Sequence, residues 1–137
     1  MRWARPVRPY NRPMTRPGLI LLAHGARDAR WAEPFLRLRA KIAAVRTGTL
    51  VELAFLEAMT PDLPSAVDAM VAGGCRSLRV VPLFLGQGGH VRDDIPRLIA
   101  SVSARYPDVP IELTSAIGED DTVLDRIAAV CVQGLPD

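Results

Sequence analysis

The chain has 137 residues, a formal net charge of +2 and two cysteines. This length fits one domain that buries about two-thirds of its unfolded surface, so folding needs no disulfide framework. No apolar run approaches the roughly 20 residues of a membrane span, and the N-terminus lacks the hydrophobic segment of a secretory signal. We therefore expect a cytoplasmic protein in which Cys75 and Cys131 are small buried hydrophobic residues.

The first 17 residues differ in composition from the rest of the chain. They carry five arginines, four prolines and no acidic residue, whereas residues 18–137 hold twelve basic and fifteen acidic residues, a formal charge of −3. Because prolines prevent a helix, residues 1–17 are expected to be a disordered tail. A tail of this kind could instead touch nucleic acid or anionic lipid, but we expect neither as a partner. The folded domain is expected at residues 18–134.

Four short apolar runs have the length and composition of buried strands. They occupy residues 18–23, 50–55, 78–85 and 110–114. Each is followed by a segment with apolar residues three and four apart, which is typical of a helix packed on one face.

The helix boundaries are marked by caps and prolines. The first helix begins near Pro34 and closes at Gly48. The second is predicted to start at Thr60, with Thr60 as hydroxyl cap and Pro61 at the first position. The third ends at Tyr106. The fourth follows Gly118 and is expected to bury one apolar face, formed by Val123, Leu124, Ile127, Ala128 and Cys131.

Strands that alternate with helices require right-handed crossovers and a parallel sheet. We therefore predict a single doubly wound α/β domain, flavodoxin-like or chelatase-like. Its four-stranded parallel sheet has the order 2-1-3-4, with helices on both faces. In such sheets ligands bind where the winding reverses, here between strands 1 and 3. His24 and His90, the only two histidines, follow those two strands, and Glu57 follows strand 2. The topology predicts that all three side chains share one crevice.

A glycine-rich loop follows the third strand. Gly86, Gly88 and Gly89 are expected to let the backbone turn through conformations that other residues avoid, and to let a flat ligand approach the main chain. His90 then lies at the mouth of the loop.

Two imidazoles and a carboxylate suit a divalent first-row metal ion such as cobalt, nickel, iron or zinc. Two or three protein ligands leave coordination positions open, which fits a metal that reacts or is passed on. No Gly-Lys-Ser/Thr sequence and no Gly-x-Gly-x-x-Gly fingerprint follows a strand, so no nucleotide is expected.

Three motifs resemble those of the small sirohydrochlorin cobaltochelatases, the CbiX-like class II chelatases. They are residues 21–25 (LLAHG), residues 55–61 (FLEAMTP) and residues 81–96 (VPLFLGQGGHVRDDIP). The resemblance runs from about residue 19 to residue 132 and is most specific in the last motif.

The resemblance implies ATP-independent insertion of a divalent metal ion, with Co²⁺ as the favoured ion, into sirohydrochlorin for cobalamin synthesis. It implies that His24 binds metal and accepts protons, that His90 is the second metal ligand, and that Glu57 assists catalysis. It also implies a homodimer, and that the tetrapyrrole is contacted by Thr60, Leu85, Gly86, Gln87, Gly88 and Gly89.

The physical reading is compatible with this chemistry. Insertion displaces two pyrrole N–H protons, so the site needs an open metal cradle and a base that titrates near neutrality. One imidazole nitrogen cannot hold a metal and accept a proton at once, so the order of these roles for His24 stays open. The substrate's carboxylates could meet Arg27 and Arg92, for which plain surface solvation is the alternative.

The sequence departs from the family pattern at two places. Ala26 replaces a common serine, and Glu119-Asp120-Asp121 stands where many relatives carry another histidine. Metal preference could therefore differ, and insertion of Fe²⁺ for sirohaem or of Ni²⁺ is the alternative within this chemistry. A metal carrier without catalytic activity and a plain flavodoxin-like interaction domain are alternatives of other classes.

Overall fold

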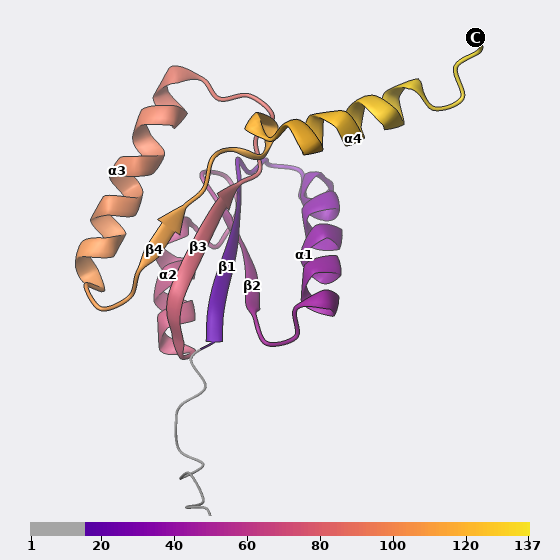
Figure 1. Ribbon diagram of the computed structural model, residues 1–137. Coiled ribbons are helices and arrows are strands. Elements are labelled where there is room, and N and C mark those ends of the chain that lie inside the picture. The colour runs from indigo at the N-terminus through magenta and orange to yellow at the C-terminus, as the bar shows by residue number, and fades with distance from the viewer. Residues whose placement is uncertain (1–15) are drawn as a thin grey trace, which may run out of the picture.

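A computed structural model describes residues 16–137 of the chain (Figure 1). The predicted tail falls mainly on residues 1–15, which lie outside the described residues, whereas Arg16 and Pro17 belong to the first strand. The strands are β1 (Arg16–Ala23), β2 (Leu50–Phe55), β3 (Cys75–Pro82) and β4 (Ile111–Leu113). The helices are α1 (Glu33–Val45), α2 (Leu63–Ala72), α3 (Gly89–Arg105) and α4 (Asp121–Val132), with 3-10 turns η1 (Ala29–Ala32) and η2 (Ile117–Glu119).

The four strands form one parallel sheet in the order β2-β1-β3-β4, which confirms the predicted topology. The register pairs Ala23 with Phe55 and Leu22 with Pro82. The carboxyl ends of β1, β2 and β3 therefore lie level with one another, and the loops that follow them meet at one edge of the sheet.

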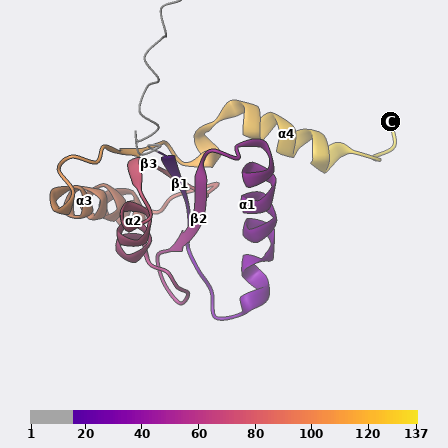
Figure 2. The ribbon, with the colours of Figure 1, turned by 90° about the horizontal axis from the view of Figure 1, so that it is seen from below.

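Alternate residues of β1 face opposite layers, as the two-residue repeat of a strand requires. Ile20 and Leu22 are fully buried against α2 and α3, in the larger core cluster. Leu21 and Ala23 point to the other face, where they pack with residues of α1. Helices thus lie on both faces of the sheet, as predicted (Figures 1 and 2).

The last helix is where the fold departs from expectation. No residue of α4 is buried, so the prediction of a buried apolar face on this helix is wrong. Cys131 is accordingly exposed, whereas Cys75 is buried as predicted, and burial raises the pKa of the Cys75 thiol; both cysteines are free. Figures 1 and 2 both show α4 leaving the body of the domain.

Three predicted boundaries also shift. The second helix is capped by Asp62 rather than by Thr60, because the Asp62 carboxylate accepts a hydrogen bond from the Ser65 N–H at 2.9 Å. The third strand ends at Pro82 rather than at residue 85, since the main chain after Leu83 bonds to a different segment. The third helix begins at Gly89, so His90, which was expected at the mouth of the loop before the helix, lies in its first turn.

One charged cluster joins α2 to the end of α3. The Asp68 carboxylate accepts hydrogen bonds from the Tyr106 hydroxyl at 2.5 Å and from the Arg105 guanidinium. The Tyr106 hydroxyl, and after it Arg105, hold the pKa of Asp68 below its ordinary value of 3.8. Because the pKa of Asp68 is lower in the folded protein than in the unfolded chain, the ionised carboxylate stabilises the fold when the pH is above the unfolded-chain pKa. This contribution is lost as the pH falls through the lowered pKa of the folded protein.

Asp68→Asn should therefore lower the free energy of unfolding at pH 7. The difference from the original protein should shrink as pH falls below about 4. Urea unfolding of both proteins at pH 7 and at a pH below about 4 measures the difference in the free energy of unfolding. A deficit of equal size at acidic and neutral pH would contradict the ionic origin of the contact.

Candidate functional site

The loops after β1 and β2 are joined by main-chain hydrogen bonds beyond the last strand pair. The Leu56 N–H donates to the Ala23 carbonyl at 3.0 Å, and the Glu57 N–H donates to the His24 carbonyl at 2.9 Å. His24 and Glu57 are therefore held side by side by the backbone itself, as the topology predicts.

Gly25 allows this close approach. Its φ is +92°, a left-handed conformation that residues with a side chain rarely adopt. A Cβ atom built at this position would lie 1.8 Å from the Glu57 carbonyl oxygen. Ala58, directly after Glu57, is the only described residue other than glycine with a positive φ, at 61°. The sharp turns thus lie next to the two predicted catalytic residues, where strained backbone is typical of functional sites.

The His24 ring is oriented by a third segment. It packs against the Phe84 ring, with centroids 4.4 Å apart and planes tilted by 39°. Phe84 is 3% exposed, and its carbonyl accepts a hydrogen bond from the Gly118 N–H at 2.9 Å. The exposed imidazole therefore rests on a buried support at the carboxyl edge of the sheet.

His24 and Glu57 line a cavity of about 470 Å³, in the size range of small-molecule sites. Helix α3 closes its other side with residues spaced three and four apart, which lie on one helical face. The full lining is His24, Leu56, Glu57, Val91, Asp94, Ile95 and Leu98. Asp94 was not predicted as a site residue, although its spacing of one residue before Ile95 and four before Leu98 could have indicated it.

The structure does not bring His90 into this lining. Val91 lines the cavity, and His90 is the residue before it. Because one residue turns a helix by about 100°, the His90 side chain lies outside the face of α3 that lines the cavity. It is four residues before Asp94, so by spacing it lies on the Asp94 side of the helix. Within residues 16–137 no three His, Cys, Asp or Glu side chains are grouped closely enough to hold a metal ion. The predicted set of two imidazoles and a carboxylate is not assembled.

Other predicted substrate contacts line a second cavity, of about 290 Å³, on the β4 side of α3. Gln87 and Arg92 both face it, and Ile95 lines both cavities. The Arg92 guanidinium lies 3.9 Å from the Glu119 carboxylate. Thr60 is exposed and lines neither of these two cavities.

The glycines of the loop after β3 do not have the conformational role predicted for them. Gly86, Gly88 and Gly89 all avoid positive φ, and a Cβ atom at each would meet nothing within 4 Å. The conformational reason is therefore wrong. What the glycines leave is open space above the loop, next to Leu85, whose side chain is 63% exposed.

The acidic residues before α4 have separate roles. The Asp120 carboxylate caps α4 by accepting hydrogen bonds from the Thr122 and Val123 N–H groups, at 2.8 and 3.3 Å. Only Glu119 is directed at a predicted site residue, through its ion pair with Arg92.

These features define a doubly wound α/β protein with an imidazole and two carboxylates in a cavity where the winding reverses. A family model described as CbiX matches residues 18–132. Since this covers most of the sequence, the chain belongs to the CbiX family.

Individual relatives agree in sequence and in structure. The chain is 28% identical to the sirohydrochlorin cobaltochelatase of Methanocaldococcus jannaschii, over 80% of this chain and 93% of that protein. It is similar to the structure of a putative cobalamin biosynthesis CbiX protein from Marinobacter aquaeolei (TM-score 0.76, 33% identity, 87% and 97% coverage). The structure of the sirohydrochlorin chelatase SirB from Bacillus subtilis subspecies spizizenii in complex with cobalt is also similar (TM-score 0.71, 27% identity). This match covers 82% of our chain but 48% of that one.

The substitution Gly25→Ala should destabilise the protein by more than about 1–2 kcal/mol, because it adds a strained φ to a clash with the Glu57 carbonyl. The matched control Gly88→Ala should change the free energy of unfolding by less than about 1 kcal/mol, since its new methyl group meets open space. Chemical denaturation of both variants measures the difference. Equal stabilities would contradict the backbone account of the site.

Proposed function

We propose that the protein inserts a divalent metal ion, with Co²⁺ as the favoured ion, into sirohydrochlorin without hydrolysing a nucleotide. One observation carries the proposal. In a chain of the CbiX family, His24 lines a cavity with two carboxylates at the edge of the sheet where the winding reverses.

The reaction exchanges protons for a metal ion. The free-base macrocycle loses two pyrrole N–H protons as the ion forms bonds to the ring nitrogens, and the ion sheds water. In the proposed mechanism, His24 coordinates the incoming ion and, once the ion has moved to the ring, the freed imidazole nitrogen accepts a proton. Glu57 and Asp94 face the same space, where their negative charge favours a cation and their oxygens can take the second proton.

The macrocycle would lie across the open glycine loop. Its flat face would contact the exposed Leu85 side chain, and the bare backbone of Gly86, Gly88 and Gly89 would let it come close. In this pose its carboxylates reach the Arg92 guanidinium and the Gln87 amide in the second cavity. Thr60, in the exposed turn after β2, would contact its rim.

His90 would bind the ion before it enters the cavity. It is exposed in the first turn of α3, on the side that carries Asp94. In this proposal His90 and then His24 hold the metal in succession, since His90 does not line the cavity that His24 lines. Fe²⁺ and Ni²⁺ are the alternative ions, since imidazole accepts all three.

The protein is proposed to act as a homodimer in the cytoplasm. Reducing conditions there would keep the two free thiols reduced. No helix within residues 16–137 has the length and apolar character that crossing a membrane requires.

Insertion should be visible as a change in the absorbance spectrum of sirohydrochlorin after Co²⁺ is added. His24→Ala should lower kcat by about 100-fold or more, the usual effect of losing a general base. Arg92→Gln should mainly raise KM, because it removes a contact to substrate carboxylates and leaves the proton acceptor in place. The absence of a spectral change with Co²⁺, Fe²⁺ and Ni²⁺ would contradict the proposed chelatase activity.

The alternative function, that of a metal carrier without catalytic activity, makes a different prediction. It would bind Co²⁺ through His24 and His90 and would show no affinity for sirohydrochlorin. Fluorescence or calorimetric titration of the metal-free protein with the macrocycle alone separates the two. Binding supports the chelatase, and its absence together with tight metal binding supports the carrier.

A further inference from the structure

The Arg92 guanidinium is loosely paired with the carboxylate of Glu119. Arg92 lies in α3 and Glu119 in turn η2, and both residues line the second cavity, of about 290 Å³. The Arg92 Nη2 atom and the Glu119 Oε1 atom lie 3.9 Å apart, which is longer than a hydrogen bond. The two groups attract each other, but the donor groups of the guanidinium are not used by this carboxylate.

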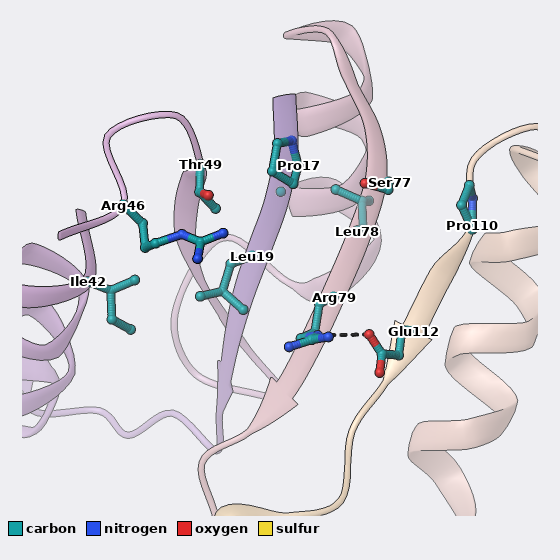
Figure 3. A pocket seen from close by; sticks show the side chains of 11 residues that line it. Pro17, Leu19, Ile42, Arg46, Thr49, Ser77, Leu78, Arg79, Pro110 and Glu112 are labelled. Carbon is teal, nitrogen blue, oxygen red and sulfur yellow. Dashed lines mark hydrogen bonds and ion pairs between the residues drawn. The ribbon is translucent and has the colours of Figure 1, made fainter. Parts of the chain in front are cut away.

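Another arginine–glutamate pair in the sheet provides a comparison. Arg79 on β3 and Glu112 on β4 are register partners, and the Arg79 Nε atom donates to the Glu112 carboxylate at 2.8 Å (Figure 3). These two side chains are each 59% exposed, against 65% and 54% for Arg92 and Glu119. Since the exposure is similar, the two pairs differ in geometry and not in their contact with solvent. The Arg92 guanidinium can therefore accept a better placed partner.

The backbone of Glu119 is fixed beside the second cavity. In turn η2 the Glu119 N–H donates to the Ala116 carbonyl at 2.9 Å, and the Gly118 N–H donates to the Phe84 carbonyl at 2.9 Å. A Cβ atom at Gly118 would lie 1.9 Å from the Leu85 carbonyl oxygen, so the turn is packed directly on the loop after β3. Only the exposed Glu119 side chain is free to rotate. Its negative charge therefore stays near the cavity when a ligand arrives.

The lining of the second cavity carries one positive and one negative group. Arg92 and Glu119 are its charged residues, and its neutral polar residues are Gln87, Thr114 and Ser115. A carboxylate that enters the cavity meets a guanidinium whose charge is already balanced. To bind Arg92 through two parallel hydrogen bonds, the preferred geometry of this pair, it has to replace Glu119 as the counter-ion.

We propose that Glu119 competes with the substrate for Arg92 and so limits how tightly the second cavity holds an anionic ligand. The competition costs every anion that uses Arg92 a similar free energy. A small anion has few other contacts to offset this cost and is kept out, whereas a macrocycle that also lies on the glycine loop still binds. The inference rests on the proposed function in one respect, the pose that brings substrate carboxylates to Arg92.

Equilibrium binding of sirohydrochlorin to the full, metal-free chain tests the competition. Glu119→Gln removes the charge and keeps the shape. It should bind the macrocycle about two- to five-fold more tightly than the original protein, as expected for one exposed ion pair. Glu119→Asp keeps the charge and should bind like the original protein. The gain of Glu119→Gln should shrink in about 1 M NaCl, where charges interact over only about 3 Å.

Two other results of this titration would overturn the proposal. Weaker binding by Glu119→Gln would mean that Glu119 positions Arg92 for the substrate. Unchanged binding would mean that the carboxylate of Glu119 and those of the substrate do not compete.

Further variants show whether Arg92 carries the effect. In the Arg92→Gln background, Glu119→Gln should give no gain, because no guanidinium is left to release. The matched control Glu112→Gln breaks the closed pair with Arg79 outside the second cavity and should leave the affinity unchanged. An equal gain from Glu119→Gln in both backgrounds, or the same gain from Glu112→Gln, would reveal a general effect of net charge and overturn the competition.

The absorbance assay for metal insertion separates this inference from the proposed function. Tighter binding by Glu119→Gln in a protein that inserts no metal ion would support the competition for Arg92 and refute the chelatase. Insertion by a protein whose affinity for sirohydrochlorin does not change in Glu119→Gln would refute the competition alone. The absence of any binding would refute both.

Discussion

The arrangement of the site depends on the hydrogen bond from the Glu57 N–H to the His24 carbonyl. It extends the pairing of β1 and β2 beyond the last strand residues, so two loops that are distant in the sequence become one rigid corner. Gly25 allows this because a side chain there would collide with the Glu57 carbonyl. Burial of Ile20 and Leu22 in the sheet fixes the strands that carry these loops. The position of the imidazole therefore follows from the strongest part of the core, and the exposed ion pairs contribute little to it.

Much of the architecture could be predicted because it depends on simple periodicities. The apolar runs specify four strands, the helical spacing specifies four helices, and the handedness of crossovers restricts the strand order. The proximity of His24 and Glu57 followed from that order alone. The family motifs were also readable without a structure, because each is a short continuous stretch of sequence.

What could not be predicted depends on rotation about a helix, on loop conformation and on tertiary packing. His90 and Asp94 lie on the same side of α3 but one turn apart, and only the turn that carries Asp94 reaches the cavity. The left-handed conformations expected at the loop glycines are absent, because a permissive residue need not adopt one. The buried apolar face predicted for α4 is absent, because helical spacing indicates an amphipathic helix but does not say what the helix packs against. The Asp62 cap was missed because Thr60-Pro61 offered a stronger local signal.

The central claim is that the His24 cavity receives the metal ion. Anomalous diffraction from a crystal soaked in Co²⁺ tests it most directly. We expect a cobalt peak at coordination distance, about 2.1 Å, from a His24 imidazole nitrogen, on the side that faces Glu57 and Asp94. Cobalt bound only elsewhere, with the His24 imidazole free, would contradict the account.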